Sequence, residues 1–287
     1  MHRLAPVLAV AALGAGCAGS SATPTGVDRN RPPSTAGQAA APSPTSAAAS
    51  PAAAGSTARA IYYLHDTGQG PRLYREFHSR PATTAVVRDA VTAMLTVHAD
   101  DADYTSLWPK GTSVRGARIS GTTAYVDLSR EARNGNAGSG GEEASLQQLV
   151  YTVTAAAPSV RDVQLLIDGR TVQTLWGHVD TGRPMARRMA AEVLGPVWLL
   201  VPTSLKAGGR FGGEASVFEA TVSWEFRQGS RIVKAGSTNA SMGAPGRGPW
   251  SDVASVPPGH YVLRAYESSA KDGTPTFVDD KPVTVTA

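Results

Sequence analysis

The chain has 287 residues, a formal net charge of +4 and 17% charged residues. Its Lys and Arg residues are scattered along the chain, whereas a nucleic-acid-binding surface needs clustered basic residues with base-stacking aromatics among them. We therefore exclude nucleic acid as a partner. The only cysteine is Cys17, so no disulfide can form within the chain.

The N-terminus is typical of an exported bacterial protein. A basic start precedes the apolar run Leu4–Leu13, which is shorter than the about 20 apolar residues that span a bilayer. Small residues then lead to Cys17, as in lipoproteins, although Gly14 stands where the lipoprotein signal usually has leucine. We predict a lipoprotein signal peptide over residues 1–16 and a lipid (palmitate) anchor on Cys17, which places the protein on the extracytoplasmic face of the cell membrane. The alternative is an ordinary signal peptide followed by a chance cysteine.

The segment after the signal is compositionally biased. Residues 17–57 consist mainly of Ala, Ser, Thr, Pro and Gly, with almost no large apolar side chains. Such a segment cannot bury enough apolar surface to offset the entropy lost on ordering. We predict a disordered tether between the anchor and the folded part.

Apolar periodicity begins after residue 58. Residues 60–66 are rich in β-branched and aromatic side chains and predict a strand that pairs with residues 72–81. Residues 83–97 place apolar side chains on one helical face, with Thr83 or Thr84 as the N-cap.

The next elements alternate in the same way. Residues 113–129 predict a hairpin that turns at Ser120-Gly121, and residues 142–154 predict a helix whose N-terminus is favoured by Glu142 and Glu143. Residues 162–175 predict a second hairpin, with Asp168-Gly169 as a type I′ turn. This order predicts an α+β domain in which two helices pack on one face of a sheet.

Five separate blocks of this region resemble a GerMN domain, the module first named in spore germination and sporulation proteins and also found in actinobacterial lipoproteins. The blocks are IYYL, VDLS, EEASLQQLVYTVT, VQLLIDG and VDTGRPMARR, and the resemblance covers Arg59–Arg188. We assign residues 58–190 to this domain. The family is not known for catalysis, so the resemblance implies interaction.

Residues 191–287 contain short strand candidates separated by Gly- and Pro-rich turns, without a convincing helix. This pattern favours a β-sandwich. The blocks VFEATV, GPWSDV and YESSAKDG resemble the immunoglobulin-like domain of bacterial spore germination proteins. That domain commonly follows a GerMN domain, so the two resemblances support each other.

One motif suggests an enzyme. Ser268 and Lys271 have the S-x-x-K spacing of the acyl-serine enzymes that act on the cell wall. In those enzymes the motif opens a helix, whereas Asp272-Gly273 and Pro275 follow here and favour a turn. The companion motifs S-D-N and K-T-G are also missing, so we predict a turn and no enzyme.

The histidines do not predict a metal site or a cofactor. His65 and His78 lie on strands that can pair, but zinc typically takes three or four protein ligands, and no third ligand is evident nearby. We therefore predict no metal and no cofactor.

Four residues remain as candidates for partner binding: Trp250, Glu219, Lys271 and Asp272. Trp250 follows Gly248-Pro249, where it either anchors a partner from an exposed position or packs under a loop. Glu219 lies inside a predicted strand and either faces solvent or pairs with a residue such as Lys271.

Together, these features predict a membrane-anchored lipoprotein whose two domains act as a non-catalytic interaction or scaffold module with other envelope proteins. The alternative is a binder of peptidoglycan or another wall polymer through loops of the sandwich. A wall hydrolase would need carboxylates or a nucleophile in one cleft, and the sequence does not bring such groups together.

Overall fold

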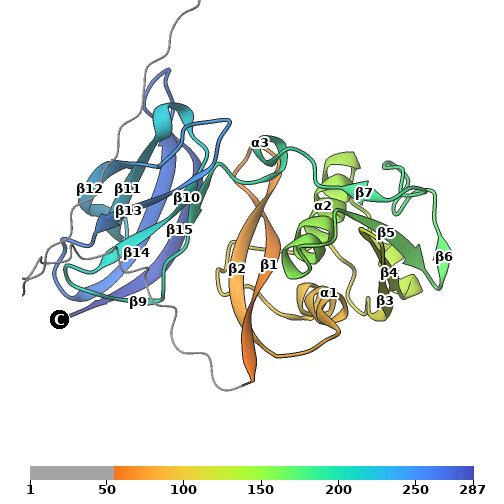
Figure 1. The fold of residues 1–287 in the computed structure, drawn as a ribbon. Helices are drawn as coiled ribbons and strands as arrows, with labels where there is room; N and C mark the ends of the chain where they lie inside the picture. The colour runs from red at the N-terminus through yellow and green to blue at the C-terminus, as the bar shows by residue number, and fades with distance from the viewer. Residues whose placement is uncertain (1–54) are drawn as a thin grey trace, which may run out of the picture. The chain divides into compact units, whose positions relative to one another are not determined.

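The computed structural model describes residues 55–287 (Figure 1). The predicted signal peptide, Cys17 and the tether up to residue 54 lie outside the described residues. Along this part of the chain, no helix is both long and apolar enough to cross a membrane.

The fold starts with an antiparallel ribbon of two long strands, β1 (Ser56–Asp66) and β2 (Pro71–Pro81). The predicted pairing is confirmed, with Tyr63 opposite Tyr74. The first strand begins at Ser56, so the last two residues that we assigned to the tether belong to the ribbon.

Two helices follow, α1 (Val86–Thr96) and α2 (Ser139–Ala156), near their predicted positions. The predicted threonine N-cap is wrong, because Ala85 is the N-cap of α1 and no side chain caps the helix. The Thr83 hydroxyl instead accepts a 3.1 Å hydrogen bond from the Ala85 N–H. Because Ala85 precedes the first helical residue, Val86, this bond does not satisfy an N–H group of the first helical turn.

The second sheet is mixed. Its strands are β3 (Val114–Ser120), β4 (Thr123–Leu128), β5 (Asp162–Ile167), β6 (Arg170–Thr171) and β7 (Met185–Ala186). Their order is β3-β4-β5-β6, with β7 also paired to β5, and β4 runs parallel to β5. That parallel pair needs a crossover connection, which the 3-10 turn η1 (Arg130–Asn134) and α2 provide. The predicted type I′ turn is confirmed, since Asp168 (φ 49°) and Gly169 (φ 76°) both adopt positive φ.

The helices lie between the ribbon and the mixed sheet (Figure 1). Both helices contact β1, while α1 also contacts β3 and α2 also contacts β5. The predicted packing of two helices on one face of a sheet therefore holds for the mixed sheet, and the ribbon covers the other side of the helices. This arrangement explains why almost every residue of α2 from Ala144 to Thr154 is buried.

The C-terminal part is a β-sandwich, preceded by the short helix α3 (Ala190–Val193). One sheet has the order β13-β10-β8 and the other the order β12-β11-β14-β15-β9. The strands are β8 (Val197–Leu199), β9 (Ser204–Lys206), β10 (Arg210–Ala215), β11 (Thr221–Gln228), β12 (Arg231–Asn239), β13 (Gly248–Val253), β14 (Gly259–Ser268) and β15 (Pro275–Thr286), with the 3-10 turn η2 (Phe218–Ala220) before β11.

Aromatic rings fill the centre of the sandwich. Phe211 makes edge-to-face contacts with Trp224, Phe226 and Trp250, with ring centroids 5.2–6.1 Å apart. Offset contacts of this kind are the favoured geometry for aromatic pairs. The predicted α+β class, with a β-sandwich after the helical domain, is confirmed.

Candidate functional site

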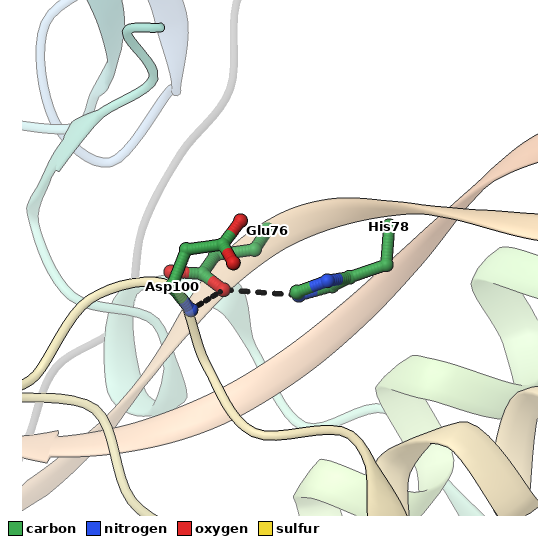
Figure 2. A group of neighbouring side chains, drawn as sticks. All are labelled: Glu76, His78 and Asp100. Atoms are coloured by element: carbon green, nitrogen blue, oxygen red, sulfur yellow. Dashed lines mark hydrogen bonds and ion pairs between the residues drawn. The ribbon is translucent and has the colours of Figure 1, made fainter. Parts of the chain in front are cut away.

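A group of buried charged side chains surrounds Glu76 on β2. Its carboxylate accepts hydrogen bonds from His78 Nε2 (3.0 Å) and the Asp100 N–H (2.9 Å) at one oxygen, and from the Asp101 N–H (3.0 Å) at the other (Figure 2). Burial raises the pKa of Glu76, but these donors and Lys281 outweigh it and hold the pKa below its usual value. Glu76 therefore stays ionised and fixes the loop after α1.

The pattern of β2 explains how the site forms. Glu76 and His78 are two residues apart, so their side chains leave the same face of the strand. Phe77 between them points the other way and is 54% exposed. Behind His78, the Tyr63 hydroxyl lies 3.1 Å from Nε2 and donates to the Val97 carbonyl.

Lys281 on β15 supplies the balancing cation. Its Nζ lies 2.7 Å from a carboxylate oxygen of Asp101 and 3.9 Å from Glu76, and it also sits over the ring of Tyr104. Both carboxylates are buried, so the ammonium offsets charges that would otherwise be costly to keep out of water. The bond links the sandwich to the loop of the N-terminal domain.

Another buried acid, Asp279, lies two residues before Lys281 on β15. Asp279 is 1% exposed, and its carboxylate accepts hydrogen bonds from the Tyr104 hydroxyl (2.9 Å) and the Leu199 N–H (2.6 Å). Burial is the main influence, and it raises the pKa of Asp279 to about 7. Asp279 thus connects the N-terminal domain to β8 and titrates near neutral pH.

Aromatic and cationic groups complete the joint. Trp198 on β8 donates from Nε1 to the Leu73 carbonyl on β2 (3.0 Å). The guanidinium groups of Arg75 and Arg247 lie 5.0 Å and 4.3 Å from the centre of its ring, and Arg75 also pairs with Glu214 at 2.5 Å. Burial lowers the pKa of Arg247 to about 10. Since β2 and β8 belong to different domains, these contacts hold the domains together.

A cavity of about 440 Å³ opens beside this cluster. Its lining includes Glu76, Asp100, Asp101 and Lys281 of the cluster, together with Arg75, Phe77, the segment 199–203 and Pro282. The cavity can therefore admit solvent or a small polar species next to Glu76.

The hydrogen bonding limits the chemistry that this cluster can perform. The carboxylates of Glu76, Asp101 and Asp279 each accept bonds from protein donors, so none is held ready as a general base. Asp100 differs from these three residues, because its side chain is exposed. In the described part of the chain, its carboxylate receives no hydrogen bond and no cation lies within ion-pair distance of it.

The structure corrects the prediction for Trp250. Its side chain is 4% exposed and packs against Phe211 in the sandwich core. The alternating burial of β13 turns Trp250 inward, while Pro249 before it faces outward. Trp250 therefore cannot serve as an exposed aromatic anchor for a partner, and the competing interpretation, packing in the interior, is correct.

The other three candidates lie in turns. Glu219 is exposed in η2 with φ 52°, not inside a strand, and the structure gives it no ion pair with Lys271 within residues 55–287. Lys271 and Asp272 are exposed after β14, where the Asp272 carboxylate accepts from the N–H and hydroxyl of Thr274. None of these residues reaches the Glu76 cluster.

The S-x-x-K motif forms the predicted turn. Ser268 ends β14, and its hydroxyl contacts Ser223 at 2.9 Å, while the Ser269 hydroxyl accepts from the Lys271 N–H. Ser268 and Lys271 therefore do not share a helical face, as the acyl-serine mechanism would require.

The two histidines that we considered for a metal lie apart. His78 pairs across the ribbon with Arg59, and His65 pairs with Arg72. His65 contacts the backbone carbonyls of Asp103 and Val278. The side chains that could share a metal with His78 are instead Glu76 and Asp100, which were not predicted from the sequence. The alternating Glu-x-His of β2 was the available signal, but nothing local pointed to residues 100 or 281.

Glu142 is a further buried acid, and its role was not predicted from the sequence. It is 0% exposed, and its carboxylate accepts from the N–H groups of Leu175, Trp176 and His178 at 2.8–3.1 Å. Burial raises its pKa, but these donors and the His178 ring outweigh that effect and leave the pKa low. Glu142 thus holds the loop after β6 rather than only favouring its own helix terminus.

Two protein families match the chain. The Germane family, described as sporulation and spore germination, matches residues 60–173. The Gmad2 family, described as an immunoglobulin-like domain of bacterial spore germination, matches residues 203–274. No curated protein sequence matches the chain.

Solved structures show weaker likeness. The first GerMN domain of the Bacillus subtilis sporulation protein GerM is 20% identical, over 46% of this chain and 98% of that one, with a TM-score of 0.39. The tandem GerMN domains of the same protein are 15% identical, over 69% of this chain and 61% of that one, with a TM-score of 0.39. A Clostridium perfringens protein assigned as a lipoprotein is 19% identical, over 48% of this chain and 93% of that one, with a TM-score of 0.34.

At these TM-scores the solved structures carry no argument, and the assignment rests on the two family matches. The matches fall within residues 58–190 and 191–287, which the sequence assigned to the same two families. The chain carries a GerMN domain of the sporulation and spore germination family, followed by an immunoglobulin-like domain of the bacterial spore germination type.

Proposed function

We propose that the protein is an extracytoplasmic lipoprotein, anchored to the cell membrane through Cys17, whose two domains form a non-catalytic interaction module for other envelope proteins. The observation that carries this proposal is the buried network at the domain joint. Lys281 of the sandwich donates to Asp101 of the GerMN domain, and Asp279 of the sandwich accepts from Tyr104 of the GerMN domain. The buried carboxylates of the network are therefore engaged in internal hydrogen bonds.

A network of this kind suits a scaffold better than an enzyme. A catalytic acid or base must be free to exchange a proton with substrate, whereas Glu76 and Asp101 are already bonded to backbone N–H groups or to Lys281. The same bonds keep the two domains in one unit, so a partner that contacts both domains would meet a preorganised surface.

Each domain also offers an edge strand to a partner. In the N-terminal domain, β3 is an edge strand of the mixed sheet and carries Ile119, which is 44% exposed. In the sandwich, β12 is an edge strand of the larger sheet and carries Ile232, which is 48% exposed. An edge strand presents unpaired backbone groups to which an extended partner segment can bind. The exposed isoleucines would add apolar contact area at the same edges.

Binding to a wall polymer was the alternative, and it relied on Trp250 as an exposed aromatic residue. The burial of that side chain removes this basis. We therefore propose protein partners and not peptidoglycan.

The anchor is tested by fractionation of cells that express Cys17→Ser. We expect the variant to move from the membrane fraction to the soluble fraction, with the wild-type chain retained in the membrane. Retention of the variant would contradict the lipid anchor.

The absence of catalysis is tested separately by a zymogram of the purified chain on cell-wall substrate. We expect no clearing at any protein load. Clearing that persists after repeated purification would contradict the non-catalytic role.

A further inference from the structure

The exposed carboxylate of Asp100 points to a function of the Glu76 cluster that the scaffold role does not require. Glu76, His78 and Asp100 each offer one ligand atom, and these atoms all lie within 4.8 Å of one another (Figure 2). We propose that these three residues form a binding site for a divalent cation of the zinc class.

The charge around this point favours a cation. Glu76, Asp100 and Asp101 carry three carboxylates, while Lys281 is the one ammonium that the described residues place among them, and it is directed to Asp101 and Glu76. Asp100 has no such partner among residues 55–287. A divalent ion would neutralise the excess negative charge that Asp100 adds beside Glu76.

The distances fit a metal with little rearrangement. Ligand atoms that each lie about 2 Å from zinc are roughly 3–3.5 Å apart in a tetrahedral site. His78 Nε2 and the nearest Glu76 oxygen are already 3.0 Å apart. Asp100 is exposed, so its side chain is free to close the remaining distance.

The metal would replace one hydrogen bond and leave the others in place. In the metal-free site, a hydrogen bond joins His78 Nε2 to a carboxylate oxygen of Glu76, and the ion would replace this bond. On binding, the hydrogen leaves Nε2, which then ligates the ion, and the neutral imidazole carries its one proton on Nδ1. The Asp100 and Asp101 N–H groups still donate to Glu76, and the Tyr63 hydroxyl still donates to Val97.

The ligand set selects the kind of cation. One imidazole nitrogen with two carboxylate oxygens suits zinc and similar transition metals, whereas magnesium and calcium prefer oxygen ligands alone. Three protein ligands leave at least one position for water, and the neighbouring cavity of about 440 Å³ supplies the space for it.

The experiment is isothermal titration of the mature chain with ZnCl₂, together with the shift in melting temperature on addition of the metal. We expect one zinc per chain and a higher melting temperature. Asp100→Asn should weaken binding by at least about tenfold, because even residues outside the ligand shell change metal affinity by about 10–100-fold. His78→Gln should weaken binding to the same degree.

Asp103→Asn is the matched control. Asp103 is an exposed carboxylate in the same loop but lies outside the group of three, so its substitution should leave zinc binding unchanged. Asp100→Asn alters an exposed side chain, so it keeps the test valid even if His78→Gln does not fold. The proposal fails if the wild-type chain binds no zinc, or if Asp100→Asn binds zinc as tightly as the wild type.

Discussion

Lys281 donates a 2.7 Å hydrogen bond to the carboxylate of Asp101, although the two residues are 180 positions apart in the sequence. The bond joins the last strand of the sandwich to the loop after α1 in the GerMN domain. Asp101 is buried and Lys281 is largely covered, so each charge depends on the other for compensation. Stability of the described unit is therefore tied to this pair.

The first prediction concerns this ion pair. Lys281→Met keeps the aliphatic bulk but leaves the buried carboxylates of Asp101 and Glu76 without their cation. Removal of one partner of a buried pair costs about 3–5 kcal/mol, and we expect a loss near the lower value because Lys281 retains some solvent contact. Urea unfolding at pH 7 measures the loss.

The control is Lys271→Met, at an exposed turn position, which should cost less than about 0.5 kcal/mol. Equal stability of the two variants would contradict the role of the pair.

The second prediction concerns pH. The pKa of Asp279 is raised from 3.8 to about 7 in the folded chain, so between these values the folded state holds a proton that the unfolded state has lost. Its contribution to stability is therefore greatest at low pH and is lost as the pH rises through about 7. Asp279→Asn removes the titration and can keep both hydrogen bonds, with its oxygen toward Leu199 and its amide toward Tyr104.

Unfolding free energies measured from pH 4.5 to pH 8 test this prediction. We expect the wild-type chain to lose more stability over this range than Asp279→Asn does. Parallel profiles for the two proteins would show that Asp279 does not titrate in this range in the folded state.

The third prediction concerns Glu142. Glu142→Gln replaces one carboxylate oxygen with an amide that cannot accept from the surrounding N–H groups, so at least one buried donor loses its partner. We expect a loss of about 2 kcal/mol at pH 7, measured by chemical denaturation. Glu143→Gln is the control, because Glu143 is partly exposed and pairs with Arg188 near the surface. A smaller loss for Glu142→Gln than for the control would be inconsistent with the buried contacts.

The low pKa of Glu142 adds a pH dependence of opposite sign to that of Asp279. Its stabilising contribution is present above the ordinary pKa of glutamate and is lost as the pH falls through the lower folded value. The Glu142→Gln variant should therefore approach the wild type in stability under acidic conditions.

The fourth prediction separates packing from binding at Trp250. Trp250→Ala should destabilise the chain by about 3–5 kcal/mol because it leaves a cavity beside Phe211. Trp250→Phe should cost much less, since it keeps a ring and removes an indole N–H that has no hydrogen-bond partner in the described residues. Thermal unfolding measures both. If Trp250→Ala were as stable as the wild type, the side chain would not belong to the core.

Local patterns in the sequence were sufficient for much of the fold. The β1–β2 ribbon follows from its β-branched and aromatic run, and the turn at Asp168-Gly169 follows from the positive φ that both residues tolerate. The sandwich followed from short strands and turn residues. These features depend on neighbours in the chain, which a sequence displays directly.

The same local reasoning failed at Glu219. The segment VFEATV alternates like a strand, but Glu219 and Ala220 adopt left-handed φ values of 52° and 59° and form a turn before β11. Two consecutive left-handed residues without glycine have no local signature. Tertiary contacts, such as the Glu267 carboxylate that accepts from the Phe218 N–H, help to define this turn.

The candidate site was beyond prediction for a different reason. Glu76, Asp100 and Lys281 come from a strand, a loop and the last strand of the other domain. Their approach depends on how the two domains join, and no periodicity or spacing encodes that. Only the Glu76–His78 half of the site, two residues apart on one strand, was visible in the sequence.

We propose that the two domains form an interaction module for envelope proteins. The most direct measurement is photo-crosslinking in living cells, with a photoreactive amino acid at Ile119 or Ile232 of the full-length chain, followed by mass spectrometry of the captured material. Met189, which is exposed but lies outside the strands, provides the matched control position. We predict that the same envelope proteins are captured repeatedly from an edge strand and not from position 189. Glycan-linked material without a recurrent protein, or no capture from either strand, would contradict the claim.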